Sequence, residues 1–100
     1  MNITKTAKGN DLTLSLAGRI DTITQIQLSN EIDRAFQDGF SNLILDFGEV
    51  VYISSAGIRV IIETHKKITF SGYQLKLTNV NDTVKNVFDI TGISNILNIN

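Results

Sequence analysis

The chain has no cysteine, proline or tryptophan, and it has one histidine in 100 residues. Without cysteine there is no disulfide framework, no thiol nucleophile and no cysteine-based zinc site. The charges nearly balance, with 9 Lys and Arg against 10 Asp and Glu, so we do not expect direct nucleic-acid binding. No apolar run has the length of a membrane span, and residues 1–5 lack the apolar core of a signal peptide. These absences lead us to expect a cytoplasmic protein without membrane insertion.

The length of the chain is enough for one hydrophobic core and too short for two, so we expect a single domain over residues 1–100. Because proline is absent, the seven glycines provide the breaks between elements. Most of these glycines separate segments whose apolar period changes. We find no internal repeat, low-complexity tract or linker.

The apolar spacing predicts an α/β fold in the order β-β-α-β-α-β-α, with a mixed sheet that starts with an antiparallel hairpin. Residues 2–7 and 12–17 predict the hairpin, which Gly18–Asp21 should end. Residues 42–47 and 73–78 predict two further strands. The helical stripes between and after these strands are Leu28-Ile32-Ala35-Phe36, Ile58-Ile61-Ile62-His65-Ile68 and Val84-Val87-Phe88-Thr91.

The helix ends are marked by polar residues and glycines. Thr22 or Thr24 is expected to cap the first helix, which Gly39 should close. The second helix is expected to stop at residues 71–72. The third should begin at residues 81–82 and close at Gly92. We expect residues 93–100 to form a short strand or an irregular cover.

The most informative segment is the run from Val50 to Ile62, where an apolar stretch halts at Ser54 and Ser55 and then resumes with helical spacing. This pattern places the two hydroxyls where a buried strand leads into a helix. A serine at a helix start is a natural cap, and the unpaired N–H groups and the helix dipole there also favour a phosphate. The residues alone leave both interpretations open.

Catalytic patterns are otherwise missing. His65 lies on an apolar helical stripe, which favours a half-buried structural residue. A triad of Ser55 and His65 with Asp21 or Asp46 fails, because ten helical residues separate the first two by roughly 15 Å. There is no Gly-x-Ser-x-Gly elbow, phosphate-binding loop or metal-ligand cluster. We therefore expect no enzymatic activity, no cofactor and no metal site.

Two aspartates are predicted near the hydroxyls. Asp21 and Asp46 each follow a predicted strand, and either can act as a turn or capping residue. The carboxyl ends of parallel strands and the starts of the following helices share one edge of a sheet. We therefore expect Asp21, Asp46, Ser54 and Ser55 to gather at that edge.

Four segments of the chain resemble the STAS domain, and in particular the bacterial anti-sigma factor antagonists. The resemblance covers nearly the whole chain and keeps the same order. The segments are Leu16-Ala17-Gly18-Arg19-Ile20-Asp21, Ile44-Leu45-Asp46-Phe47-Gly48-Glu49-Val50, Tyr52-Ile53-Ser54-Ser55-Ala56-Gly57-Ile58-Arg59-Val60 and Val87-Phe88-Asp89-Ile90-Thr91-Gly92-Ile93.

The resemblance implies a partner-switching module that binds an anti-sigma factor serine kinase of the GHKL type and is reset by a phosphatase of the PP2C type. Matched position by position, it implies that Ser55 is the phosphorylated residue. The adjacent Ser54, a departure from the family pattern, is a second candidate acceptor. The partner-binding residues it implies are Asp21, Ser54, Ser55, Ala56, Gly57 and Arg59. In such a module Ser55 is a substrate and not a catalyst.

The chain departs from the family pattern at two points. Ser54 stands where regulated members usually have Asp, and the chain ends at Asn100, where many members continue into a further helix. The alternative function is that of an unphosphorylated STAS-type interaction subunit in a lipid or anion transport assembly, in which Ser55 only caps the helix. A small enzyme or nucleotide-binding domain is a weaker third reading.

Overall fold

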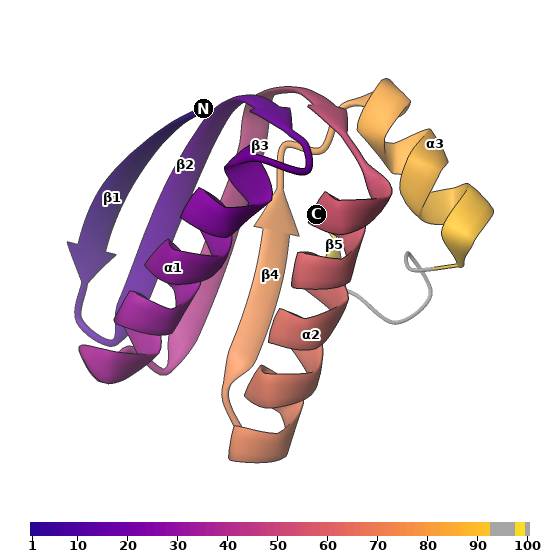
Figure 1. Cartoon of the computed structure of the whole chain (residues 1–100). Coiled ribbons are helices and arrows are strands. Elements are labelled where there is room, and N and C mark those ends of the chain that lie inside the picture. Colours follow the sequence, from indigo (N-terminus) through magenta and orange to yellow (C-terminus); the bar gives the residue numbers. More distant parts are fainter. Residues whose placement is uncertain (93–97, 100) are drawn as a thin grey trace.

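The computed structural model describes residues 1–92 and 98–99, and these form a five-stranded sheet with three helices (Figure 1). The strands lie in the order β1-β2-β3-β4-β5; β1 is antiparallel to β2, and the other neighbours are parallel. The predicted element order is confirmed. The elements are β1 Asn2–Lys8, β2 Asp11–Ile20, α1 Thr24–Gln37, β3 Asn42–Ile53, α2 Ser55–Ser71, β4 Gln74–Thr78, α3 Asp82–Thr91 and β5 Asn98–Ile99.

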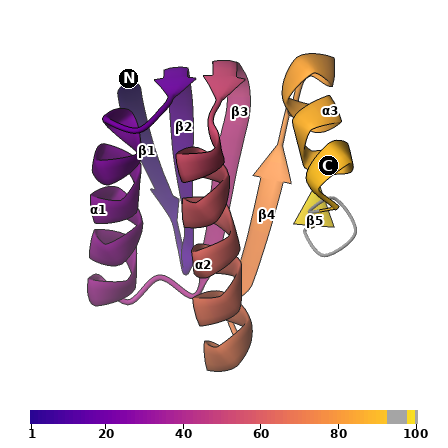
Figure 2. The same cartoon turned by 45° about the vertical axis from the view of Figure 1, so that its right-hand side comes forward.

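One face of the sheet is apolar and the other is polar, because side chains alternate along each strand. Leu12, Leu14 and Leu16 of β2 are buried, and the residues between them are partly exposed. Helices α1 and α2 lie side by side over the apolar face, where they pack on β2, β3 and β4 (Figures 1 and 2). None of the helices in residues 1–92 has the length and apolar composition needed to span a membrane.

Two strands are longer than the sequence predicts. β2 continues through Gly18 to Ile20, and β3 continues through Gly48 to Ile53. The β2–β3 register shifts near both glycines, and Gly18 has a φ of +107°. A glycine inside a strand often marks a bulge. The predicted bounds 12–17 and 42–47 are therefore too short, because the chain bends at the two glycines and stays in the sheet. β2 ends at Ile20, within the 18–21 segment that is expected to end the hairpin.

The predicted ends of the second and third helices are confirmed. Gly72 and Gly92 are left-handed C-caps, and the side chain of Asn81 accepts a hydrogen bond from the Val84 N–H at 2.9 Å. Phe88 of α3 packs edge-on against Phe47 of β3, with ring centroids 6.0 Å apart. Of the predicted tail, residues 93–97 and 100 lie outside the described residues, and Asn98–Ile99 forms a short strand beside β4.

The start of α2 lies very close to the sheet at Gly57. A Cβ atom at this position would lie 2.6 Å from Cγ2 of Ile20 and 2.8 Å from Cγ1 of Ile53. Both isoleucines are buried and both are branched at Cβ, so neither can move aside easily. Glycine is therefore required here by close packing.

We predict that Gly57→Ala lowers the free energy of unfolding by about 1–3 kcal/mol, because the added methyl group overpacks the contact with the two isoleucines. This is the net loss that remains after the roughly 1 kcal/mol by which alanine is favoured over glycine in a helix. Equilibrium unfolding in urea measures the difference. The control is Ser55→Ala, an exposed position where we expect a change within about 0.5 kcal/mol. A Gly57→Ala protein that unfolds at the same or higher urea concentration would contradict the prediction.

Candidate functional site

The candidate site is the junction where β3 leads into α2 beside the end of β2. Ile20 and Ile53 are paired in the parallel ladder, and the Ser54 N–H donates to the Ile20 carbonyl at 2.8 Å. Asp21 and Ser54 follow the two isoleucines and therefore leave the sheet side by side. The starts of α1 and α2 lie at this same end of the molecule (Figure 2).

Ser54 is the N-cap of α2, as the sequence predicts. Its backbone is extended, and its hydroxyl oxygen accepts a hydrogen bond from the Gly57 N–H at 3.3 Å. Its carbonyl accepts the first helical bond, from the Ile58 N–H at 2.9 Å. The side chain is half-buried and is engaged by the helix that it starts.

Ser55 is the first residue of α2, and it is exposed. Within the described ranges its hydroxyl makes no hydrogen bond, so no partner in the chain has to be displaced when the exposed side chain is modified. The first N–H groups of a helix lack intrahelical partners, and the dipole makes this end electropositive. The hydroxyl therefore stands where an added anion would be tolerated.

Asp21 organises the turn between β2 and α1. Its Oδ1 accepts hydrogen bonds from the N–H groups of Ile23 and Thr24, both at 3.0 Å. The bond from the Thr24 N–H is the largest cause of the lowered pKa of this carboxyl, and desolvation opposes it. The Ile23 N–H, the Thr24 hydroxyl and the nearby Arg19 lower the pKa further. Asp21 therefore carries a negative charge at neutral pH.

The expected caps of α1 are wrong. Neither Thr22 nor Thr24 caps the helix, whose N-cap position is Ile23 and lacks a side-chain bond. The Thr24 hydroxyl instead donates to the Arg19 carbonyl at 2.6 Å, and Asp21 binds the N–H groups of the turn. An aspartate two residues before a turn N–H forms this arrangement readily.

Four apolar side chains around the start of α1 and near the end of β3 are exposed, and sequence reasoning missed them. We call this group the apolar rim, and it consists of Ile23, Ile26, Val51 and Tyr52. Ile23 is 79% exposed, and the Tyr52 ring lies under the Arg19 guanidinium at 4.3 Å. A usable signal was present, because Ile26 lies off the apolar stripe that contains Leu28 and Ile32. An exposed apolar group beside a polar centre is typical of protein interfaces.

The remaining predicted residues divide into two groups. Ala56 is half-buried and Arg59 is exposed one turn along α2 from Ser55, so both belong to the junction. Asp46 does not, which corrects the expectation that it joins Asp21 at the edge. β3 continues beyond Asp46 to Ile53, and the Asp46 carboxylate instead accepts bonds from the Gly48 N–H at 2.9 Å and the Asn79 amide at 3.0 Å.

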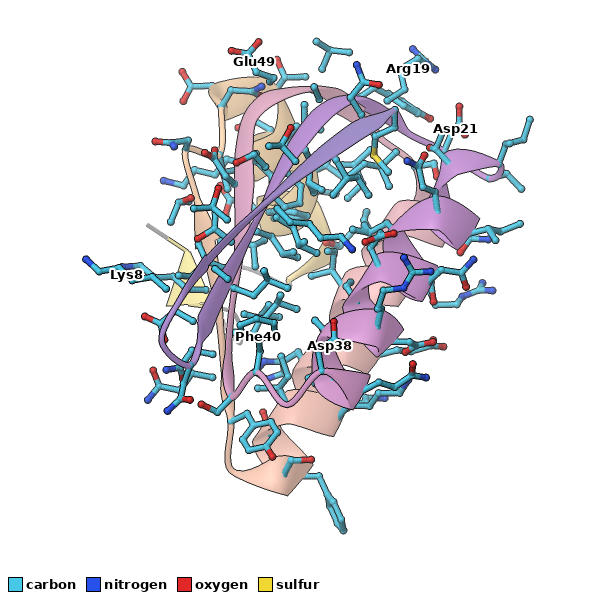
Figure 3. All side chains as sticks on the ribbon, turned by 90° about the vertical axis from the view of Figure 1, so that its left-hand side faces the viewer. Lys8, Arg19, Asp21, Asp38, Phe40 and Glu49 are labelled. Carbon is cyan, nitrogen blue, oxygen red and sulfur yellow. The ribbon has the colours of Figure 1, made fainter. Side chains whose placement is uncertain are left out.

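Figure 3 places Arg19 and Asp21 together at one end of the molecule, and it places Asp38 and Phe40 toward the other end. Arg19 Nε lies 4.0 Å from the Asp21 carboxylate. Within the described ranges no three His, Cys, Asp or Glu side chains are grouped as metal ligands. His65 is half-buried on α2. The junction therefore offers a reachable hydroxyl, a fixed carboxylate and an exposed apolar rim.

We predict that Asp21→Asn removes a pH-dependent part of the stability while keeping an oxygen that can accept the same backbone bonds. Because folding lowers the Asp21 pKa, the charged form contributes stability above the ordinary aspartate range, and this contribution is lost as the pH falls through the lowered pKa. We expect the wild type to have a larger free energy of unfolding than Asp21→Asn at pH 7, and this difference should vanish in acid. Urea unfolding of both proteins from pH 7 downward measures it. A difference that stays constant across this range would contradict the assignment.

Comparisons with known proteins place the fold and the family. The STAS domain matches residues 2–100. The anti-sigma-B factor antagonist of Bacillus subtilis is 29% identical over 99 residues, which are 99% of this chain and 90% of that protein. The protein of the same name from Staphylococcus aureus is 24% identical over 100 residues, which are 100% of this chain and 93% of that protein.

Solved structures show the same architecture. An anti-sigma factor antagonist from Mycobacterium paratuberculosis has a TM-score of 0.88 at 17% identity. The match covers 98% of this chain and 83% of that chain. The Bacillus cell fate determinant SpoIIAA in its phosphorylated form has a TM-score of 0.77 at 18% identity. The match covers 99% of this chain and 91% of that chain. At these identities the likeness concerns the fold. The match over residues 2–100, by contrast, decides the family: this chain belongs to the STAS domain family.

Proposed function

We propose that this chain is an anti-sigma factor antagonist that works by partner switching: it binds an anti-sigma serine kinase and is released when Ser55 is phosphorylated. The observation that carries the proposal is the exposed Ser55 hydroxyl at the start of α2. The names of the Bacillus and Staphylococcus relatives support the antagonist function. The solved phosphorylated form of SpoIIAA supports a phosphorylation switch.

Of the two adjacent serines, Ser55 is the better acceptor. The Ser54 hydroxyl is half-buried and accepts the bond from the Gly57 N–H, so its modification would disturb the helix start. Ser55 is exposed and makes no such bond in the part of the chain that the structure describes. A kinase can therefore reach the Ser55 oxygen without unfolding the first turn.

Phosphorylation would change the charge of the junction without changing the fold. A phosphate adds about −1.5 to −2 charge at pH 7, and the unpaired N–H groups of the helix start can accommodate it. The apolar rim would pack against the kinase in the unmodified complex. Burying an unpaired dianion in such an interface is costly, so the phosphorylated chain should leave the complex without a large conformational change.

The chain would supply the substrate and the docking surface in this cycle. The nucleotide, the metal and the catalytic base would belong to the GHKL-type kinase, and a PP2C-type phosphatase would restore the hydroxyl. The fixed charge of Asp21 next to the junction would add repulsion toward the new phosphate. Arg59, exposed one turn along α2, would offer a cation to the partner.

We predict that incubation with the anti-sigma kinase of the same organism and Mg-ATP adds one phosphate, and that Ser55→Ala abolishes the addition. Intact-protein mass spectrometry with peptide mapping measures the modification. The matched control is Ser54→Asp, which removes the neighbouring hydroxyl but keeps a helix-capping side chain, and it should still be phosphorylated on Ser55. A phosphate that persists in Ser55→Ala, or a wild-type chain that the kinase binds but leaves unmodified, would refute the switch.

We also predict that Ser55→Asp weakens binding to the kinase at least about tenfold, because it places an unpaired charge in the interface. Asparagine has nearly the same shape as aspartate but no charge, so Ser55→Asn should bind the kinase at least about threefold more tightly than Ser55→Asp. Both variants should unfold within about 0.5 kcal/mol of the wild type, because the position is exposed. Titration calorimetry and urea unfolding provide the two measurements. Equal affinities for the two variants would rule out charge as the cause of release.

A further inference from the structure

Two adjacent hollows lie at the end of α2 that is remote from Ser55. The larger one, about 560 Å³, is lined by Phe36 of α1 together with Lys66, Lys67 and Phe70 of α2. The smaller one, about 300 Å³, shares Lys66 and Phe70 and adds His65. The hollows therefore follow the last turns of α2 and meet at the Phe70 side chain.

The apolar part of this surface is unusually exposed. Phe70 is 95% exposed, the largest exposed fraction among the large apolar side chains that the structure describes. Phe36 is half-buried and packs against the core from the end of α1. A large aromatic side chain left in water beside shallow hollows is typical of a surface that binds a partner.

The charge of the surface indicates what kind of partner fits. Among the described residues that line either hollow, every ionisable side chain is basic or a histidine, and the others carry hydroxyls or aromatic rings. Lys67 forms an exposed ion pair with Asp33 at 3.3 Å. Lys66 has no ion pair within the described ranges, so its charge is available to a carboxylate.

We propose that the two hollows dock an acidic amphipathic helix of a partner protein. Lys66 and Phe70 are one helical turn apart, and the hollows flank Phe70. A partner helix with two apolar side chains at positions i and i+4, about 6 Å apart, would place one beside each face of Phe70. Glutamates beside those positions would meet Lys66 at the rim, where opposite charges favour the correct partner.

The position of the hollows gives this docking a consequence for regulation. Phe70 is fifteen residues after Ser55 in the same helix, so about 22 Å of helix separates the two positions. A helix seated at Phe70 leaves the junction uncovered. Binding there should therefore be indifferent to the charge at Ser55, which makes this a docking surface independent of the proposed switch.

Nuclear magnetic resonance titration of the ¹⁵N-labelled full chain tests the proposal with two synthetic helical peptides. Both peptides carry leucine at i and i+4; one has glutamates beside them, and the other has lysines at the same places. We expect the glutamate peptide to shift the amide signals around Lys66, Phe70 and Phe36 and to bind at least tenfold more tightly than the lysine peptide. Added salt should weaken the binding of the glutamate peptide.

Three variants decide the interpretation. Phe70→Ser and Lys66→Glu should each weaken the binding of the glutamate peptide at least fivefold, and Lys66→Glu should strengthen the binding of the lysine peptide. Ser55→Asp should bind the glutamate peptide as the wild type does. Equal binding of the two peptides, shifts centred elsewhere or no effect of Phe70→Ser would overturn the proposal. The proposal would also be overturned if neither peptide binds. In that case, wild-type chain that co-sediments with vesicles of phosphatidylglycerol and phosphatidylcholine, and Phe70→Ser chain that does not, would indicate a membrane surface instead.

Discussion

The start of α2 is fixed against the ends of β2 and β3 by contacts that leave little freedom in its position. The Ser54 N–H bonds to the Ile20 carbonyl, and Gly57 brings the helix backbone close to the side chains of Ile20 and Ile53. Because the helix is anchored on its inner side, its outer side presents Ser55 to solvent in a defined place. The exposed hydroxyl is thus a consequence of tight packing directly beneath it.

The sequence predicts the order of the elements well, because apolar period and helix-capping residues are local signals. Asn81, Gly72 and Gly92 mark helix ends as expected. The strands that contain Gly18 and Gly48 are predicted too short, because they bend at these residues and continue. In the sequence, a glycine that ends a strand cannot be distinguished from one that allows a bulge within it. The pairing of β2 with β3 separates them, and that pairing is a long-range property.

The same distinction explains what could be predicted of the candidate site. Ser54, Ser55 and Gly57 are close in sequence, so their arrangement at a helix start follows from local rules. Asp46 is misplaced because the true end of β3 depends on its neighbours in the sheet. The apolar rim is missed for a related reason: whether Ile23 or Val51 is exposed depends on how α1 and β3 end in space.

Ser54 gives this junction a different charge balance from the family motif that it resembles, in which an aspartate takes this place. A serine caps the Gly57 N–H with a neutral oxygen, so the start of α2 keeps more of its positive potential. A phosphate on Ser55 would then meet less repulsion from within the chain itself. Most of the unfavourable energy of the phosphate would arise at the partner interface, through the apolar rim, with Asp21 as the fixed negative charge nearby. Such an arrangement suits a switch that must alter affinity while leaving the fold unchanged.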